Sequence, residues 1–147
     1  MAKQAETVTL GPDYVLDEQI GYLLRLAGQR HAAIFQSLIS EGLTPTQFST
    51  LIRISEHGQV SQNHLGRLAA MDVATIKGVV DRLKAKALVI ARPDPGDKRR
   101  SNICLTEKGA ALIADLKADG LRITEETLAP LSAGERRTLA RLLRKIC

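Results

Sequence analysis

The sequence predicts a mostly α-helical fold with a small β wing, and three observations predict it. Apolar residues recur at helical spacing over most of the 147 residues. Aromatic residues make up only 3% of the chain and Trp is absent, so the core must consist mainly of Leu, Ile, Val and Ala, which suits helices. One Pro-Gly turn cluster, at residues 93–96, separates two short strand-like runs. A chain of this length forms one domain without disulfides or a structural metal.

The chain is expected to begin with a flexible tail, residues 1–12, followed by a long helix from about Leu16 to Ser40. A helix of about 25 residues would extend roughly 37 Å, which is long for so small a domain and indicates a partner outside it. Gly42 is expected to end this helix. Its helically spaced apolar positions are Ile20, Leu23, Leu24, Ala27, Ile34, Phe35 and Leu38.

The next three helices are marked by their N-terminal caps. Thr44 caps the second helix with Pro45 at its first position, and His57-Gly58 ends it. Ser61 caps a short third helix, and Asp72 caps a fourth that follows after a tight turn. The fourth helix carries a stripe that should be buried, formed by Ile76, Val79, Val80 and Leu83.

A hairpin and two further helices complete the order. Strands are expected at residues 88–92 and 101–105. Thr106 caps a fifth helix, Pro130 breaks the chain, and a capping box at residues 132–135 starts the last helix. Two helices joined by a tight turn and followed at once by a hairpin form a winged helix-turn-helix. Apolar positions are Ala111, Leu112, Leu116, Leu121 and Ile123 on the fifth helix and Leu139, Leu142, Leu143 and Ile146 on the last.

The positive charge of the chain is concentrated in its middle third. Residues 61–109 carry 10 basic and 5 acidic side chains, net +5, whereas residues 1–60 are net −2 and residues 110–147 net +2. A localised basic segment is the electrostatic footprint of a nucleic-acid surface. An ordinary solvated surface with extra lysine is the alternative that charge alone leaves open.

The fourth helix is the expected reader of DNA bases, because the second helix of a helix-turn-helix enters the major groove. Thr75 can donate or accept a hydrogen bond, and Lys77 can reach a guanine edge or a phosphate. Gly78 costs about 1 kcal/mol relative to Ala inside a helix. Close approach to DNA and tight packing against another helix are two explanations for this glycine. The expected contacts are Ala74, Thr75, Lys77, Gly78 and Arg82.

Three small polar residues, Ser61, Gln62 and Asn63, begin the third helix. The free N–H groups at a helix N-terminus point outward and suit a phosphate. Ordinary capping by Ser61 is the alternative, and both roles can hold together.

The wing carries Lys98, Arg99 and Arg100 at its tip, next to Asp97. Three neighbouring cations repel one another unless an anionic partner is near, and a narrow minor groove attracts an inserted Arg. Asp97 can hold the Arg99 guanidinium in one rotamer. A surface ion pair alone contributes at most about 1 kcal/mol, so Asp97 is interpreted as orienting the arginine.

These motifs together resemble a known family of regulators. The run DKRRSNICLTEKG, residues 97–109, resembles the DxR…LTxxG signature of the MarR family of winged-helix regulators. Residues 61–89 look like the preceding helix-turn-helix of that family, including its VDRL step at residues 80–83. The resemblance covers nearly the whole chain. Val73 departs from it where many members have a polar or basic residue, and Ala87 where Gly commonly ends the recognition helix.

The resemblance implies a homodimeric regulator built from one domain, residues 1–147. Residues 44–105 would form the DNA-binding lobe, and residues 15–41 with 106–147 the dimerisation helices. A twofold protein implies double-stranded DNA with a near-palindromic operator, whose half-sites lie about 34–36 Å apart. The function implied is a repressor that a small organic effector releases from DNA.

The resemblance also implies an effector cleft between the DNA lobe and the dimer helices. The segment YVLDEQIGYLLRLAGQRHAAIFQ resembles members that control degradation of aromatic acids, some of which sense the acyl-CoA thioester. His31 lies on the apolar face of the first helix, either as a ligand contact or as a contact between helices. Arg25 and Arg30 are suited to a carboxylate or phosphate. The ligand contacts implied are Tyr22, Arg25, Arg30, His31 and Phe35.

Other classes of protein function are less well supported by the sequence. Neither Cys104 nor Cys147 has the setting of a reactive thiol, and His57 and His64 lack further ligands at metal spacing. An enzyme is not expected because there is no Gly-rich phosphate loop, nucleophile elbow or metal constellation, and no cofactor is expected. A winged-helix dimer that binds only proteins, or a redox- or metal-responsive regulator, stays open as an alternative.

The location expected for the chain is the cytoplasm. No apolar run approaches the roughly 18 residues that span a bilayer, so no membrane partner is expected. The N-terminus lacks the apolar region of a signal peptide.

Overall fold

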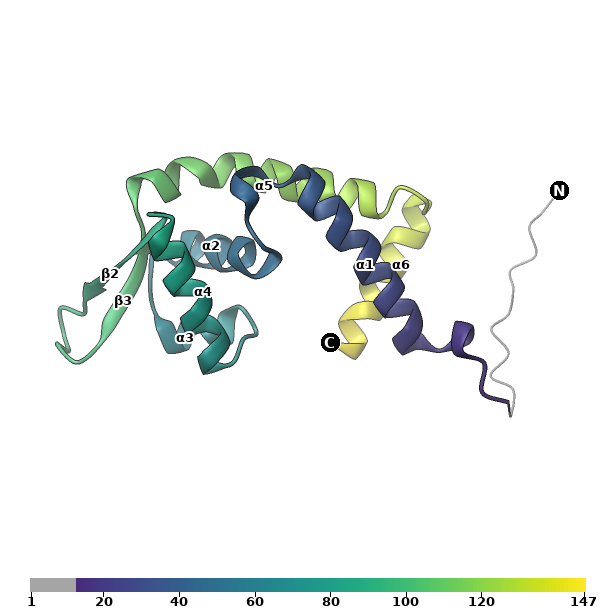
Figure 1. The fold of residues 1–147 in the computed structure, drawn as a ribbon, viewed down its shortest axis with the longest axis horizontal. Helices are drawn as coiled ribbons and strands as arrows, with labels where there is room; N and C mark the ends of the chain where they lie inside the picture. Colours follow the sequence, from purple (N-terminus) through teal and green to yellow (C-terminus); the bar gives the residue numbers. More distant parts are fainter. Residues whose placement is uncertain (1–12) are drawn as a thin grey trace.

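The computed structural model describes residues 13–147, which form two parts joined by one long helix (Figure 1). The tail expected at residues 1–12 lies outside the described residues. The mostly helical fold with a β wing is confirmed. The elements are α1 (Ile20–Leu38), α2 (Pro45–His57), β1 (Gln59–Ser61), α3 (Gln62–Leu68), α4 (Val73–Ala85), β2 (Val89–Pro93), β3 (Ser101–Leu105), α5 (Glu107–Thr127) and α6 (Ala133–Ile146).

One part is a compact lobe made by α2, α3, α4 and a three-stranded antiparallel sheet in the order β1-β3-β2. Val60 of β1 and Ala91 of β2 both pair with Ile103 of β3. The predicted hairpin strands are present, whereas β1 was not predicted, because it has three residues and only Val60 is apolar. The stripe predicted on α4 is buried in the core of this lobe and packs with Leu51, Ile54, Leu65 and Leu88.

The predicted N-terminal caps are confirmed at every helix for which one was expected. The side-chain oxygens of Thr44, Ser61, Asp72, Thr106 and Ser132 each accept a hydrogen bond from the backbone N–H three residues further on. These bonds satisfy N–H groups that have no partner within their own helix. The helix starts are therefore encoded locally.

The first helix is shorter than predicted, at 19 residues. Residues 16–18 form a separate 3-10 turn, and Gln19 is extended at the N-cap of α1. At the other end Ile39 is extended, so the helix stops before the predicted Gly42, and Glu41 adopts a left-handed φ of 62°. The physical reason lies far along the chain, because the backbone N–H of Ser40 bonds to Asp119 of α5.

Helix α5 runs from the lobe to the second part of the molecule, where it packs along α1 (Figure 1). Its N-terminal end lies so close to the sheet that a Cβ on Gly109 would overlap the backbone carbonyl of Leu88. Leu116 and Ile123 are buried as expected. Leu121, named with them as an apolar position of this helix, is instead 74% exposed.

Helix α6 turns back toward α1, and the two helices leave an open apolar groove of about 490 Å³ between them. Its lining includes the apolar stripe predicted on the last helix, of which Leu142 is 46% and Ile146 66% exposed. Leu23 and Leu24 face the groove from α1. This apolar face has no partner within the described part of the chain. Among residues 13–147, no helix is long and apolar enough to cross a membrane.

Candidate functional site

The open face of α4 carries the residues expected to read DNA. Ala74, Thr75, Lys77 and Arg82 are exposed, opposite the buried stripe of the helix. The Lys77 ammonium lies 2.9 Å from Oδ2 of Asp81, one helical turn away. Hydrogen bonding to Lys77 holds the pKa of the Asp81 carboxyl below its usual value. The pair keeps the lysine along the helix face, where it is 66% exposed.

Gly78 has open space on the outer side of α4. A Cβ built there meets only Nη1 of Arg82, at 3.3 Å, which is the end of a flexible side chain. No other helix of the described residues approaches it, so packing against a neighbouring helix does not explain the glycine.

The start of α3 lies next to α4. Oγ of Ser61 accepts the backbone N–H of His64 at 3.3 Å, so the capping role is present. Asn63 is exposed and Gln62 half-buried. Gly66 lets α3 approach α4 closely, because a Cβ there would lie 3.2 Å from Cγ2 of Ile76 on α4 and 3.1 Å from the carbonyl oxygen of Met71. No local pattern in the sequence indicated this role for Gly66.

The tip of the wing presents three exposed cations, Lys98, Arg99 and Arg100. The backbone N–H and Nε of Arg99 both donate to Oδ1 of Asp97, at 3.0 and 3.3 Å. These two hydrogen bonds lower the pKa of the Asp97 carboxyl, and the bond from the backbone N–H has the larger effect. The Arg99 side chain remains 92% exposed, so Asp97 orients the guanidinium without covering it. Figure 1 shows the wing tip and α3 on the side of the lobe away from α5.

The residues expected to bind a ligand lie on α1, and two of them are engaged by α5. The Arg30 guanidinium donates to the carbonyls of Thr127 and Glu126 at 2.6 and 3.0 Å. Nδ1 of His31 lies 2.8 Å from Oγ1 of Thr127, which is the contact between helices that the sequence left open. These bonds place a cation at the C-terminal end of α5, where the helix dipole favours it.

The other three ligand candidates contact residues near them. Phe35 is buried, with its ring edge-on to that of Phe48 at 5.8 Å between centroids. The Arg25 guanidinium lies 5.3 Å from the centre of the Tyr22 ring. Tyr22 and Arg25 therefore lie together near the start of α1, away from the Phe35–Phe48 contact.

A hollow of about 580 Å³ that is open to solvent, called here the α2–α5 cavity, lies between α2 and α5, and none of the five predicted ligand residues lines it. Its walls are mixed, with the apolar Phe48, Ile52 and Leu121 and the cationic Arg53 and Lys117. Arg53 is paired with Glu56 at 2.9 Å. No pattern in the sequence indicated this cavity, because α2 and α5 are far apart along the chain.

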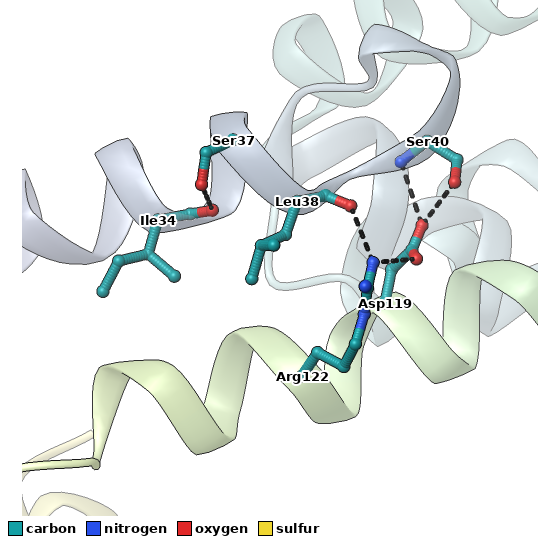
Figure 2. Close-up of polar contacts among 6 residues, drawn as sticks. All are labelled: Ile34, Ser37, Leu38, Ser40, Asp119 and Arg122. Carbon is teal, nitrogen blue, oxygen red and sulfur yellow. Dashed lines mark hydrogen bonds and ion pairs between the residues drawn. The ribbon is translucent and has the colours of Figure 1, made fainter.

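Near this cavity, α5 carries one buried carboxylate, Asp119, which is 6% exposed (Figure 2). Its Oδ2 accepts the backbone N–H and the hydroxyl of Ser40, at 2.9 and 2.6 Å. Its Oδ1 accepts from the Arg122 guanidinium at 3.1 Å, and that guanidinium also reaches the carbonyl of Leu38. Burial raises the pKa of the Asp119 carboxyl, but the bonds from Ser40 and Arg122 outweigh it and hold the pKa below its usual value.

The groups considered for redox or metal chemistry are separate from these sites. Cys104 is buried on β3, and Cys147 is exposed at the C-terminus. The rings of His57 and His64 pack edge to face at 6.0 Å. Within residues 13–147, no group of three or more His, Cys, Asp or Glu side chains is placed to hold a metal ion.

Helix α3, capped at its N-terminus, is followed by α4 with one exposed face, and a cationic wing lies beside them. This arrangement defines a winged-helix DNA-binding protein. The sequence signature of the MarR family matches residues 41–100. The HTH-type transcriptional repressor NicR of Pseudomonas putida is 47% identical over 134 residues, which cover 90% of this chain and 85% of NicR. The chain belongs to the MarR family and is a DNA-binding transcriptional regulator.

Two solved structures extend the comparison to DNA and to a ligand. BpsR of Bordetella bronchiseptica, whose DNA binding is regulated by 6-hydroxynicotinic acid, is 39% identical with a TM-score of 0.85, and the match covers 91% of this chain and 96% of BpsR. A cysteine-to-serine mutant of MarR from E. coli complexed with operator DNA is 28% identical with a TM-score of 0.81, covering 91% of this chain and 99% of that one.

Proposed function

We propose that this chain is a homodimeric repressor of the cytoplasm, without enzymatic activity, that binds a near-palindromic operator and is released by a hydroxylated aromatic monocarboxylic acid. The observation that carries the proposal is the combination of an exposed DNA-reading face on the lobe with an uncovered apolar face on α1 and α6. An open α4 face and an oriented wing arginine accompany an apolar α1–α6 groove that nothing among residues 13–147 covers.

The DNA contacts divide by role. On α4, Ala74, Thr75, Lys77, Gly78 and Arg82 face the major groove, since this face is exposed and the opposite face is core. Ser61, Gln62 and Asn63 bind a phosphate through the N-terminus of α3. In the wing, Lys98, Arg99 and Arg100 enter or border the minor groove, with Asp97 fixing the rotamer of Arg99.

The dimer is supported by the exposed apolar side chains of α1 and α6. Leu23, Leu24, Leu142 and Ile146 line one groove and are 42% to 66% exposed. Contiguous apolar surface of this kind marks an interaction site. A second copy placed there by a twofold axis buries the same residues on both chains, and would direct two lobes toward successive major grooves. Residues 15–41 and 106–147 would then form the dimerisation region and residues 44–105 the lobe.

The proposed effector is supported by the relatives and by the α2–α5 cavity. BpsR responds to 6-hydroxynicotinic acid, a small ring with one carboxylate. The cavity volume, about 580 Å³, falls within the range of about 300–1,000 Å³ for small-molecule sites. Lys117 and Arg53 supply cations for a carboxylate, and Phe48 and Ile52 an apolar wall. Tyr22 and Arg25 are further ligand contacts if the partner chain brings them near, whereas Arg30, His31 and Phe35 would have to leave their present neighbours.

The proposal is tested by selecting random duplex DNA on the purified protein at two salt concentrations. We expect an enriched palindrome whose binding weakens with salt, and titration with 6-hydroxynicotinic acid should release that DNA, whereas benzoate should act more weakly. No enriched site would favour the protein-interaction alternative. An enriched site that no aromatic acid releases would retain the DNA-binding part and contradict the effector.

A further inference from the structure

The chain crosses between the dimer helices and the DNA-binding lobe at two places. One crossing is the connection from α1 to α2, residues 39–44, and the other is α5. The first crossing is irregular, with Ile39 extended and Glu41 at a positive φ of 62°. An irregular connection does not by itself fix the angle between the parts that it joins, so that angle depends on what holds the connection.

Asp119 joins the two crossings to each other (Figure 2). Its carboxylate is buried in the middle of α5, and it accepts two hydrogen bonds from Ser40 in the α1–α2 connection. Arg122, one turn later on α5, holds the other carboxylate oxygen and reaches the last helical carbonyl of α1, at Leu38. A buried carboxylate with both oxygens bonded has few alternative positions, because loss of a bond leaves a buried charge poorly paired.

The same turn of α5 forms a wall of the α2–α5 cavity. Lys117, Gly120 and Leu121 line the cavity, while Asp119 between them points toward Ser40. Gly120 lies against Phe48, since a Cβ there would be 3.0 Å from the ring. Phe48 in turn contacts Phe35 on the last turns of α1. A molecule in the cavity would therefore contact the turn of α5 that carries Asp119, and also Phe48, which packs against Phe35 of α1.

We propose that Asp119 and Ser40 form a positioning pair that fixes the lobe at the angle needed for DNA binding and transmits cavity occupancy to the lobe. The effector half of this inference rests on the proposed function, and the DNA-binding half does not. The pair contacts neither DNA nor ligand. Its role is to make the orientation of α4 depend on the position of α5.

The test compares wild type with Asp119→Asn, Ser40→Ala and the double variant. Operator affinity is measured by fluorescence anisotropy without ligand and with saturating 6-hydroxynicotinic acid, and ligand binding is measured separately by calorimetry. Effector-linked changes in affinity are typically about 5- to 150-fold. We expect each variant to bind operator more weakly without ligand. The ratio of its operator affinity without ligand to that with ligand should fall to within about twofold of one. The double variant should add little to either single change, because the two residues act as one contact.

Ser37→Ala is the matched control, because the Ser37 hydroxyl bonds to Ile34 of its own helix at 2.8 Å and not to α5 (Figure 2). Ile123→Val, a buried change elsewhere on α5, controls for lost stability and should leave both affinities at wild-type values. Wild-type operator affinity in unliganded Asp119→Asn and Ser40→Ala would overturn the inference, whatever the effector does. A full ligand response in these variants would do the same. If wild type itself binds no aromatic acid, the proposed effector fails, and the unliganded measurements still decide the positioning role.

Discussion

Two alanines hold the most demanding backbone conformations in the DNA-binding lobe. Ala70 follows α3 and Ala87 follows α4, with positive φ values of 54° and 58°. Both helices end in the same hydrogen-bond pattern, in which Leu88 N–H bonds to the Leu83 carbonyl and Met71 N–H to that of Gly66. A left-handed conformation costs a non-Gly residue roughly 1–2 kcal/mol, so these two turns are fixed at a cost to stability.

Replacing either alanine by glycine should therefore stabilise the protein. We expect Ala70→Gly and Ala87→Gly each to raise the free energy of unfolding by about 0.5–1 kcal/mol, after the larger entropy of glycine in the unfolded chain is counted. Urea denaturation followed by circular dichroism measures this. Ala85→Gly, two positions before Ala87 at the last residue of α4, is the control and should lower stability by about 0.5–1 kcal/mol. A loss of stability in Ala87→Gly equal to that in Ala85→Gly would contradict the left-handed conformation of Ala87.

The wing arginine gives a prediction about salt. Because the Arg99 guanidinium is held by Asp97 yet exposed, Arg99→Ala should weaken operator binding and reduce the slope of log K against log salt by about 0.9. The slope is obtained from binding titrations over a series of salt concentrations. Arg137→Ala removes an exposed charge from α6 and should leave the slope at its wild-type value. An unchanged slope in Arg99→Ala would remove the wing from the DNA interface.

At the scale of elements, helix α4 combines a stable buried face with a glycine on its exposed face. Gly78→Ala should raise the free energy of unfolding by about 1 kcal/mol, because only the flexible end of Arg82 is near the added methyl group. The same change should weaken operator binding, since the methyl group would project toward DNA. Thermal denaturation and anisotropy titration measure the two effects. Gly134→Ala in α6 is the control, and it should leave operator affinity unchanged. Unchanged operator affinity in Gly78→Ala would show that α4 does not approach DNA closely there.

The elements also show which features a sequence reveals. The starts of α2 to α6 were predicted correctly because each depends on a cap and an N–H group three residues away, as at Thr44 and Asp72. The start of α1, which has no side-chain cap, was placed too early. The early end of α1 was not predictable in this way, since it depends on a bond between Ser40 and Asp119, 79 residues apart. Strand β1 was missed for a similar reason, because Val60 becomes part of a sheet only through its pairing with Ile103.

The candidate site likewise has some features that depend on neighbouring positions in the sequence and others that depend on distant segments. The exposed face of α4 and the contact between Asp97 and Arg99 follow from helical periodicity and from neighbouring positions, and the structure has both. The cavity between α2 and α5 requires two segments that are distant along the chain, and its cations, Arg53 and Lys117, belong to no local motif. The interaction of Arg30 with the end of α5 also arises only in three dimensions.

For the whole molecule, the α1–α6 face predicts a dimer that a single polar substitution should weaken. Leu142→Gln removes an apolar side chain that contributes about 1.5–3 kcal/mol when buried. A twofold interface contains it twice, so the dimer dissociation constant should rise about 100-fold or more. Sedimentation velocity over a range of concentrations measures this, and operator binding should weaken with it. Arg141→Gln changes the exposed neighbour and should remain as dimeric as wild type. A dimeric Leu142→Gln protein would place the interface elsewhere.

Helix α5 makes the molecule sensitive to small rotations. It is one continuous helix of 21 residues, which corresponds to about 32 Å. Geometry then requires that a rotation of about 5° at the end packed against α1 displaces the lobe end by about 3 Å, close to the rise of about 3.4 Å between successive base pairs of DNA. A rigid arm of this length converts an angular change too small to disturb the packing of either part into a shift of one step along the double helix.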